Sequence, residues 1–192
     1  MTFYNTTDSD KQVALTQWGD DGSTMVNGAT YSVSAMDTLV LTTDNSDFQA
    51  QGLGKILADN GIVAKLSYQY RDSHSFCEFF LDRDKTAKKW MLINSIQDFF
   101  QWFGVAISNP SDSTVDLTMK ALKNGVVVGV TSFTMDAHTK KVGVASDFWD
   151  GLAYDGLDTV ILESDQPIPA PISITGNTAQ DRHVFFNGSS ME

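Results

Sequence analysis

The chain has 192 residues, of which 42% are hydrophobic, and a formal net charge of −11 at pH 7. The small number of Lys and Arg residues, 13, argues against a nucleic-acid partner, and the acidity argues against binding to anionic membrane surfaces. No run approaches the roughly 18–20 consecutive apolar residues of a membrane helix, which argues against membrane insertion.

The first half of the chain alternates predicted strands with turns. An Asn-x-x-Asp sequence at 5–8 precedes an alternating apolar pair at 13–15, and Asp-Gly at 21–22 predicts a tight hairpin. Tyr-x-Val-x-Ala at 31–35 has the period of two that is typical of a strand with one buried face. A further strand is predicted within 59–66, where Asp is followed by Ile-x-Ala-x-Leu.

The second half contains the same series in the same order. Asn-x-x-Asp recurs at 109–112, the apolar pair at 117–119, and the hairpin signal at 124–125 as Asn-Gly. Phe-x-Met-x-Ala follows at 133–137, and Asp followed by Ile-x-Ala-x-Ile at 165–172. Chance would have to reproduce turns, alternation and the terminal motif in one order, so we predict an internal duplication.

These elements predict an all-β fold of two tandem antiparallel β-sandwich repeats packed together, with little helix. Thr, Ser, Asn and Asp supply much of the polar surface, which suits strands and tight turns. The boundaries are residues 1–90 for the first repeat and 91–192 for the second. In the second repeat Pro167, Pro169 and Pro171 predict an edge strand or a bulge, because proline has no N–H for a sheet ladder.

Two segments have helical spacing. Residues 94–103 place Ile and Phe at i, i+3, i+4 and i+7, which predicts a short helical turn that leads into an alternating strand. Residues 52–60 are a second helical candidate, because Leu53, Ile56 and Leu57 share one helical face.

The stretch Val-Ile-Leu-Glu-Ser-Asp-Gln-Pro-Ile at 160–168 completes a recognisable pattern. Together with the Asn-x-x-Asp entry and the Asp/Asn-Gly hairpin, it resembles β-sandwich modules repeated in bacterial surface and secreted proteins. The pattern is also similar to the sensory-rhodopsin transducer family of small β-sandwich proteins. The resemblance implies a fold and carries over no functional residue.

The start of the chain shows no basic segment followed by an apolar one, so no signal peptide is visible. Met1 stands only a few residues before the end of the first predicted strand, and we expect the chain to be cut from a longer protein. An extracellular or cell-surface location is favoured for such a parent. The oligomeric state stays open.

Histidine and acidic residues are the candidate metal ligands of this sequence. His74, His138 and His183 lack the spacing of a zinc site, and two of them hold matching places in the halves, which favours a structural role. Acidic loops at 44–47, 82–84 and 146–151 match no calcium loop, and Asp also closes turns. We expect no cofactor, with a calcium ion in a surface loop as the alternative.

The segment Asp-Phe-Trp-Asp-Gly-Leu-Ala-Tyr-Asp-Gly at 147–156 is the candidate ligand site. Exposed Trp149 and Tyr154 would stack on a sugar ring or a protein partner, with a polar rim around them. The alternative is that the rings fill the seam between the two sandwiches. The rim consists of Asp147, Asp150 and Asp155.

No nucleophile motif, phosphate loop or dinucleotide fingerprint is present. We therefore favour a non-catalytic binding or structural module of a larger bacterial surface, secreted or phage-like protein that recognises a glycan or a protein. The alternative is a hydrolytic enzyme whose carboxylates converge only in three dimensions. A purely architectural protein that assembles through sheet edges is the third hypothesis.

Overall fold

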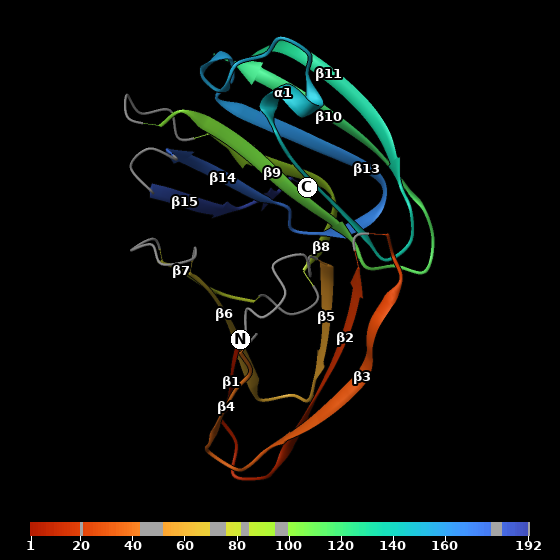
Figure 1. The fold of residues 1–192 in the computed structure, drawn as a ribbon, viewed down its shortest axis with the longest axis vertical. Coiled ribbons are helices and arrows are strands. Elements are labelled where there is room, and N and C mark those ends of the chain that lie inside the picture. Colours follow the sequence, from red (N-terminus) through yellow and green to blue (C-terminus); the bar gives the residue numbers. More distant parts are fainter. Residues whose placement is uncertain are drawn as a thin grey trace. The chain divides into compact units, whose positions relative to one another are not determined.

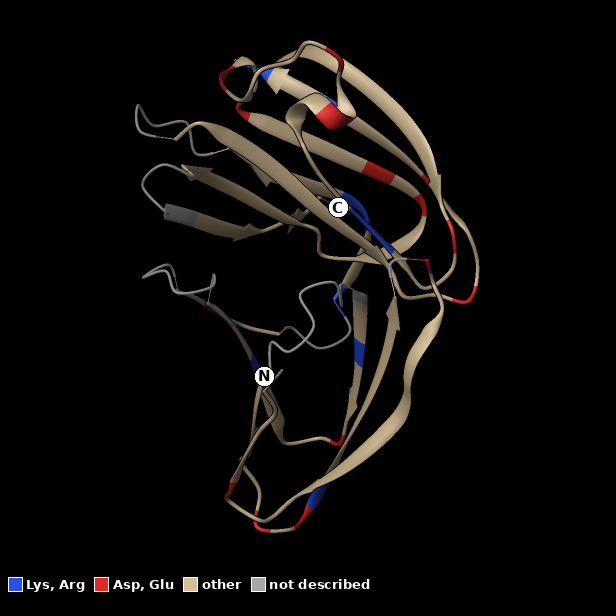
Figure 2. Cartoon of the chain, in the orientation of Figure 1, with Lys and Arg blue, Asp and Glu red and all other residues tan. Residues whose placement is uncertain are grey.

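The computed structural model describes residues 1–19, 21–42, 52–69, 76–81, 85–94, 100–177 and 182–191 (Figure 1). The chain forms two compact units, Met1–Arg83 and Asp84–Glu192. Antiparallel strands dominate both units, which confirms the predicted all-β sandwich fold. Acidic residues lie mostly at turns and strand ends of each unit (Figure 2).

The first unit contains two sheets. One has the strand order β4-β1-β6-β7 and the other the order β3-β2-β5. The strands are β1 (Thr2–Asn5), β2 (Lys11–Gly19), β3 (Thr24–Val33), β4 (Thr38–Val40), β5 (Gly52–Ala58), β6 (Ile62–Gln69) and β7 (Phe76–Phe80).

The second unit also contains two sheets, with the orders β12-β9-β14-β15 and β11-β10-β13-β8-β16. Its strand β8 spans the boundary placed at residues 90 and 91, and all of it pairs within this unit. The strands are β8 (Thr86–Ile93), β9 (Trp102–Asn109), β10 (Val115–Lys123), β11 (Val126–Met135), β12 (Thr139–Val144), β13 (Thr159–Pro169), β14 (Ile172–Asn177), β15 (Arg182–Asn187) and β16 (Ser189–Ser190).

The pairings among strands β1 to β5 have the same register as the corresponding pairings among strands β9 to β13. Val13 lies opposite Tyr31 and Ala58, and in the second unit Leu117 lies opposite Phe133 and Ser164. In the other sheet Phe3 pairs with Leu39 as Ile107 pairs with Lys141. In the second unit β13 has the further neighbour β8, which in turn pairs with β16.

The two predicted hairpins are present. Gly22 lies between β2 and β3 with a φ of 79°, and Asn124 and Gly125 join β10 to β11 with φ values of 51° and 76°. The second hairpin has a positive φ at both central residues, as a tight two-residue turn requires, and Asn and Gly adopt such a φ most readily. The first hairpin has a longer connection, between Gly19 and Thr24.

Helix is scarce among the described residues, as predicted: α1 (Ala145–Phe148) is one turn and η1 (Tyr154–Gly156) a single 3-10 turn. The helix considered for 52–60 is wrong, because Gly52–Ala58 is strand β5, paired along its length with β2. Residues 95–99 of the other helical candidate lie outside the described residues, and the alternating strand predicted after them is β9. No described helix has the length and apolar character needed to span a membrane.

The proline-rich segment forms the predicted bulge. Strand β13 shifts register against β8 between Glu163 and Ile168, and Ile168 then pairs with Ala87. Ile168 therefore ends one strand, whereas Ile62 begins another, so residues 62–66 and 168–172 match in sequence but are not equivalent strands. Residues 165–167 have no partner residue in the ladders to β10 and β8, so the missing N–H of Pro167 interrupts neither ladder.

The core of the second unit joins both of its sheets. Phe103, Val105 and Ile107 on β9 pack with residues such as Met119 on β10 and Trp90 on β8, all of them buried. The first unit has a smaller core, centred on Phe3, Val13 and Val33. Alternation within each strand directs these side chains to one face, where their burial drives folding.

Candidate functional site

One face of the five-stranded sheet in the second unit points away from the core. In β10 the buried residues Val115, Leu117 and Met119 alternate with Asp116 and Thr118, which lie on the opposite face. We call this opposite face, across β11, β10, β13 and β8, the outer face.

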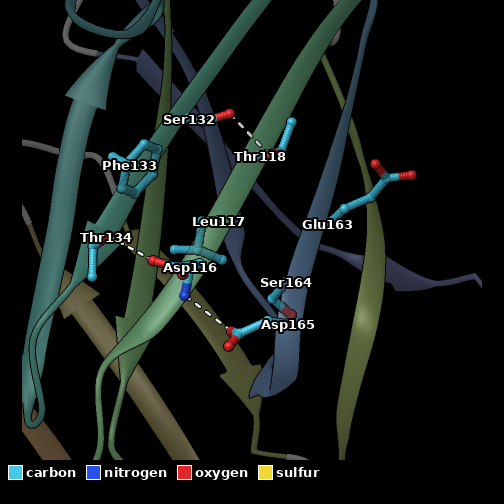
Figure 3. A pocket seen from close by; sticks show the side chains of 9 residues that line it. All are labelled: Asp116, Leu117, Thr118, Ser132, Phe133, Thr134, Glu163, Ser164 and Asp165. Carbon is cyan, nitrogen blue, oxygen red and sulfur yellow. Dashed lines mark hydrogen bonds between the residues drawn. The ribbon is translucent and has the colours of Figure 1, made fainter.

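A hollow of about 470 Å³ lies at one end of the outer face (Figure 3). Thr134 Oγ1 donates a hydrogen bond of 2.6 Å to Asp116 Oδ1, and the backbone N–H of Asp116 donates one of 2.9 Å to Asp165 Oδ1. The hydroxyl oxygens of Thr118 and Ser132 are 2.9 Å apart across β10 and β11. Polar side chains that bond to one another and to the backbone thus form this end.

Asp165 has a structural counterpart in the first unit. Asp59 Oδ2 accepts a hydrogen bond of 2.8 Å from the backbone N–H of Gln12, which corresponds to Asp116 in the shared register. The same carboxylate contact therefore joins the same two strands in both units. This contact explains why Asp recurs at the end of β5 and near the end of β13.

Glu163 lies at the centre of an ion-pair triad on the outer face. Its two carboxylate oxygens lie 2.6 Å from Lys120 Nζ and 3.0 Å from Lys89 Nζ. Hydrogen bonds from Lys120, and then from Lys89, hold the pKa of Glu163 below its usual value. Glu163 is therefore ionised near neutral pH, and it is one of the residues that line the hollow (Figure 3).

Beyond the triad the outer face becomes apolar. Val130 and Ile161 both lie opposite Lys120, and Ile161 lies opposite Met91. Val130 is 60% exposed and Ile93 is 49% exposed. We call this surface the apolar strip, and its members are Met91, Ile93, Leu122, Val130 and Ile161.

The fold by itself does not require an apolar strip. In the shared register Ile161 corresponds to Lys55 of the first unit, because Lys55 lies opposite Thr16 as Ile161 lies opposite Lys120. The same position of the same sheet thus carries a lysine in one unit and an isoleucine in the other. Exposed aliphatic side chains gathered in this way are typical of surfaces that contact other molecules.

The structure separates the residues of the predicted ligand loop. Asp147 accepts a hydrogen bond of 2.8 Å from the backbone N–H of Val144, which closes the start of α1. Trp149 is 5% exposed and belongs to the core. The expectation that its ring is open to solvent is therefore wrong, because the ring packs against Gly129 of β11.

Trp149 and Asp150 line a second hollow, of about 440 Å³, beside Val128 and Val130. Within the described part of the chain, the Nε1 atom of Trp149 is buried without a hydrogen-bond partner. Asp150 is exposed. Trp149 and Asp150 are therefore the two predicted site residues that line one hollow together.

Tyr154 and Asp155 lie on the 3-10 turn η1 and serve the fold through their backbones. The carbonyl of Tyr154 accepts a hydrogen bond of 2.5 Å from Asn94 Nδ2, and the carbonyl of Asp155 accepts one of 2.8 Å from Lys123 Nζ. The Tyr154 ring is half-buried against the core. Trp149 is thus a core residue of the second unit, and Tyr154 packs against the same core.

The histidine and acidic-loop predictions are only partly within the described residues. His138 Nε2 lies 3.1 Å from Asp112 Oδ1, in a turn where His138 has a φ of 58°. His74, the side chain of His183 and the loops at 44–47 and 82–84 lie outside the described residues. The described side chains contain no group of three or more metal-ligating residues.

Sequence reasoning missed the apolar strip and the triad. The signal was available in Val-Val-Val-Gly-Val at 126–130, an apolar run in a strand that otherwise alternates. Such a run makes both faces of the strand apolar. A strand of an antiparallel sheet with one solvated face ordinarily alternates apolar and polar residues, so the run indicates an apolar surface. Lys89 and Glu163 gave no signal because their pairing joins strands that are far apart in sequence.

Comparison with known proteins adds no relationship: no family model, curated protein or solved structure matches this chain.

Proposed function

We propose that the chain is a non-catalytic binding module that docks a protein partner on the outer face of its second unit. The observation that carries the proposal is the apolar strip, with Val130 60% and Ile93 49% exposed on a sheet whose other face is the core. Burying such side chains in a complex is favourable by about 25 cal/mol per Å² of apolar surface. Their exposure in the free protein otherwise favours aggregation.

The charges beside the strip define the chemistry of the partner. Asp116 and Asp165 are exposed at the polar end of the outer face, and the chain carries a net charge of −11. A surface with an apolar centre and Lys or Arg at its rim is complementary to this arrangement. Complementary rim charges speed association and set orientation more than they add affinity.

A protein partner has more support than a glycan. Sugar recognition by stacking needs an accessible aromatic ring, and Trp149 is buried. The hydrolase alternative also has less support, because Asp116 and Asp165 hold strand contacts and Glu163 is paired with two lysines. The carboxylates that line the hollow are thus engaged in contacts within the sheet, and no free pair is left there for acid–base chemistry.

We also infer that the two units arose by duplication of one β-sandwich. The common pairing registers and the matching contacts of Asp59 and Asp165 support this inference. The resemblance to bacterial surface and secreted modules supports a place in a larger protein outside the cell. Under this proposal the two units diverged on their outer faces, and the second acquired the apolar strip.

The test is site-specific photo-crosslinking in cells that express the chain naturally, followed by binding measurements with the purified partner. A crosslinking residue at position 130 should capture one protein that the same residue at position 142 does not. Val142 is the matched control because it is 57% exposed on β12, in the other sheet. Val130→Lys should weaken binding by at least about tenfold, as for a central contact residue, whereas Val142→Lys should leave it unchanged.

Two results would contradict the proposal. One is equal capture at positions 130 and 142, since the outer face would then have no preference for a partner. The other is unchanged affinity of the captured protein for Val130→Lys, with the fold of the variant verified by its melting temperature.

A further inference from the structure

Strand β11 is the outermost strand of the five-stranded sheet in the second unit. The sheet has the order β11-β10-β13-β8-β16, and within the described residues β11 pairs with β10 alone. The pairing is regular from Gly129 to Met135, since the register shift falls before Gly129. We call the side of this regular stretch that faces away from β10 the β11 edge.

The pairing of β10 shows which backbone groups of β11 face this edge. The N–H of Asp116 on β10 donates to a carboxylate of β13, so the backbone groups of the next residue, Leu117, face β11. Phe133 lies opposite Leu117 and faces β10 in return, and this direction alternates along the strand. The edge-facing residues are therefore Val130, Ser132 and Thr134. Within the described part of the chain, their N–H and carbonyl groups make no hydrogen bond.

The sequence of β11 lacks the features by which proteins usually protect a sheet edge. Val126–Met135 contains neither a charged residue nor a proline, although the chain as a whole has a net charge of −11. Charged side chains and proline are common means of preventing another chain from pairing at an edge. The β11 edge is therefore suited to accept a further strand.

The side chains along the β11 edge determine what the added strand carries. The edge-facing residues have their side chains on the outer face, because Ser132 lies opposite Thr118, which is on that face. At one end Val130, which is 60% exposed, offers an aliphatic contact to the residue opposite it. At the other end Thr134 lines the hollow of about 470 Å³, together with exposed carboxylates (Figure 3).

The exposed carboxylates at this end belong to Asp116 and Asp165. Within the part of the chain that the structure describes, neither forms an ion pair, and their hydrogen bonds come from the Thr134 hydroxyl and a backbone N–H. The position opposite Thr134 on an added strand lies two strand spacings from Asp116, roughly 10 Å. A Lys or Arg side chain is long enough to bring its charge to these carboxylates from there.

We propose that the β11 edge pairs with an extended, antiparallel segment of the protein partner, in which a Lys or Arg lies opposite Thr134 and an aliphatic residue opposite Val130. This inference rests on the proposed function, because it names the element by which the partner docks on the outer face. The basic residue precedes the aliphatic one by four positions in the partner, and the aliphatic one extends the apolar strip. Addition of a strand to a sheet edge is a common mode of peptide recognition, in which backbone pairing gives affinity and side chains give specificity.

Strand β3 of the first unit provides an internal control. Like β11 it is the outermost strand of its sheet and contains no charged residue. Its Ser32 lies opposite Gln12, as Thr134 lies opposite Asp116. The carboxylate of Asp116 thus has an uncharged amide at the equivalent place, so a segment with a basic residue should select β11 over β3.

The probe is the synthetic peptide Ser-Lys-Thr-Thr-Thr-Val-Thr, added to the whole chain, with hydrogen exchange read at single amides by NMR. Its second residue pairs with Thr134, its fourth with Ser132 and its sixth with Val130. At saturating peptide, exchange at the Ser132 and Thr134 amides should slow by at least about tenfold, because a paired amide exchanges only when the strand opens. Exchange at the Thr30 and Ser32 amides of β3 should stay unchanged.

Two sets of matched peptides separate backbone pairing from charge. N-methylation of the fourth residue removes an N–H that faces Ser132 and should abolish protection, whereas N-methylation of the fifth, whose N–H faces away from β11, should preserve it. Replacing the Lys by Glu should weaken binding by at least about tenfold, and replacing it by Arg should not. In the Asp116→Asn variant, which keeps an acceptor for Thr134, the preference for the Lys peptide over the Glu peptide should fall severalfold.

Four results would overturn the proposal: no protection of β11, equal protection by the two methylated peptides, equal protection of β3, or protection of β11 that rises with the concentration of the chain when no peptide is present. The last would mean that a second copy of the chain occupies the edge. All four leave the proposed function to its own test, which measures the captured protein and Val130→Lys. Failure of capture at position 130, with β11 still protected by the peptide, would contradict the proposed function and not the strand pairing.

Discussion

Asn5 and Asn109 hold the same place in the two units and make the same pattern of hydrogen bonds. Both are buried at the end of equivalent strands, β1 and β9, with exposed fractions of 4% and 1%. In each, Oδ1 accepts from the backbone and the hydroxyl two residues later, Thr7 or Ser111. In each, Nδ2 donates to three carbonyls: Ser9, Val33 and Ser34 for Asn5, and Ser113, Met135 and Asp136 for Asn109.

Asn109→Ala should destabilise the second unit by about 2–4 kcal/mol, because it leaves buried carbonyls without a donor. Chemical denaturation followed by tryptophan fluorescence measures the change. Asn109→Asp tests the cause, since its carboxylate keeps the acceptor for Ser111 but cannot donate as Nδ2 does. A stability of Asn109→Asp equal to that of the wild type would show that the donated bonds contribute nothing.

Gly129→Ala should destabilise the second unit by about 1–3 kcal/mol, as overpacking does. A Cβ at residue 129 would lie 2.8 Å from Cδ1 of Trp149, too close for a ring held in the core. Combining Gly129→Ala with Trp149→Phe should restore part of the loss, because the smaller ring leaves room. Simple additivity of the two substitutions in a double-mutant cycle would contradict this contact.

Trp90→Phe should cost more stability than Trp149→Phe, although both rings are buried. Trp90 Nε1 donates to the carbonyls of Ala87 and Ile168 at 3.1 and 3.3 Å, whereas Trp149 Nε1 has no partner among the described residues. Trp90→Phe removes the Nε1–H donor and leaves the carbonyls of Ala87 and Ile168 without it, which adds about 1 kcal/mol or more to the cost of lost packing. Urea denaturation of the two variants gives the comparison, and equal losses would be the contrary result.

The Glu163 triad should make stability depend on pH in acid. Hydrogen bonds from Lys120 and Lys89 lower the pKa of Glu163 below its usual value of 4.5. A lowered pKa in the folded state means that the stabilisation is present above the unfolded pKa and is lost as pH falls through the folded pKa. Because the side chain is 35% exposed, the contribution is below about 1 kcal/mol.

Glu163→Gln isolates this contribution. Its cost in the free energy of unfolding should be present at pH 7 and should disappear well below pH 4.5, and salt should reduce it. Thermal unfolding across this pH range provides the measurement. A cost that is the same at both ends of the range would show that the triad does not act through the charge of Glu163.

Local sequence patterns predicted some elements of the structure correctly and others wrongly. The hairpins at Gly22 and Gly125 and the strand at Phe103, Val105 and Ile107 were predicted because turn chemistry and alternation are local. Residues 52–60 were misread as helix because Leu53, Ile56 and Leu57 match a helical face as well as they match a short strand, and only pairing with β2 decides between them.

The candidate sites were harder to predict than the strands. The aromatic-acidic loop was chosen from residue type, but the side chain of Trp149 reaches Gly129, 20 positions earlier in the chain, and is buried there. Val130 was not predicted as a site residue, because valine is common in strands and its exposure depends on which face of the strand it occupies. Exposure depends on which face of a strand is covered, and residue type does not state this.

By itself, therefore, the sequence determined that the chain is all-β, where its hairpins turn and in which order its strands follow, because backbone preferences and alternation act over a few residues. Only the tertiary structure decided that β8 lies between β13 and β16, that β13 shifts register against β8, and that aliphatic side chains gather on one outer face. These features arise from contacts between strands far apart in the chain, and burial is a property of those contacts.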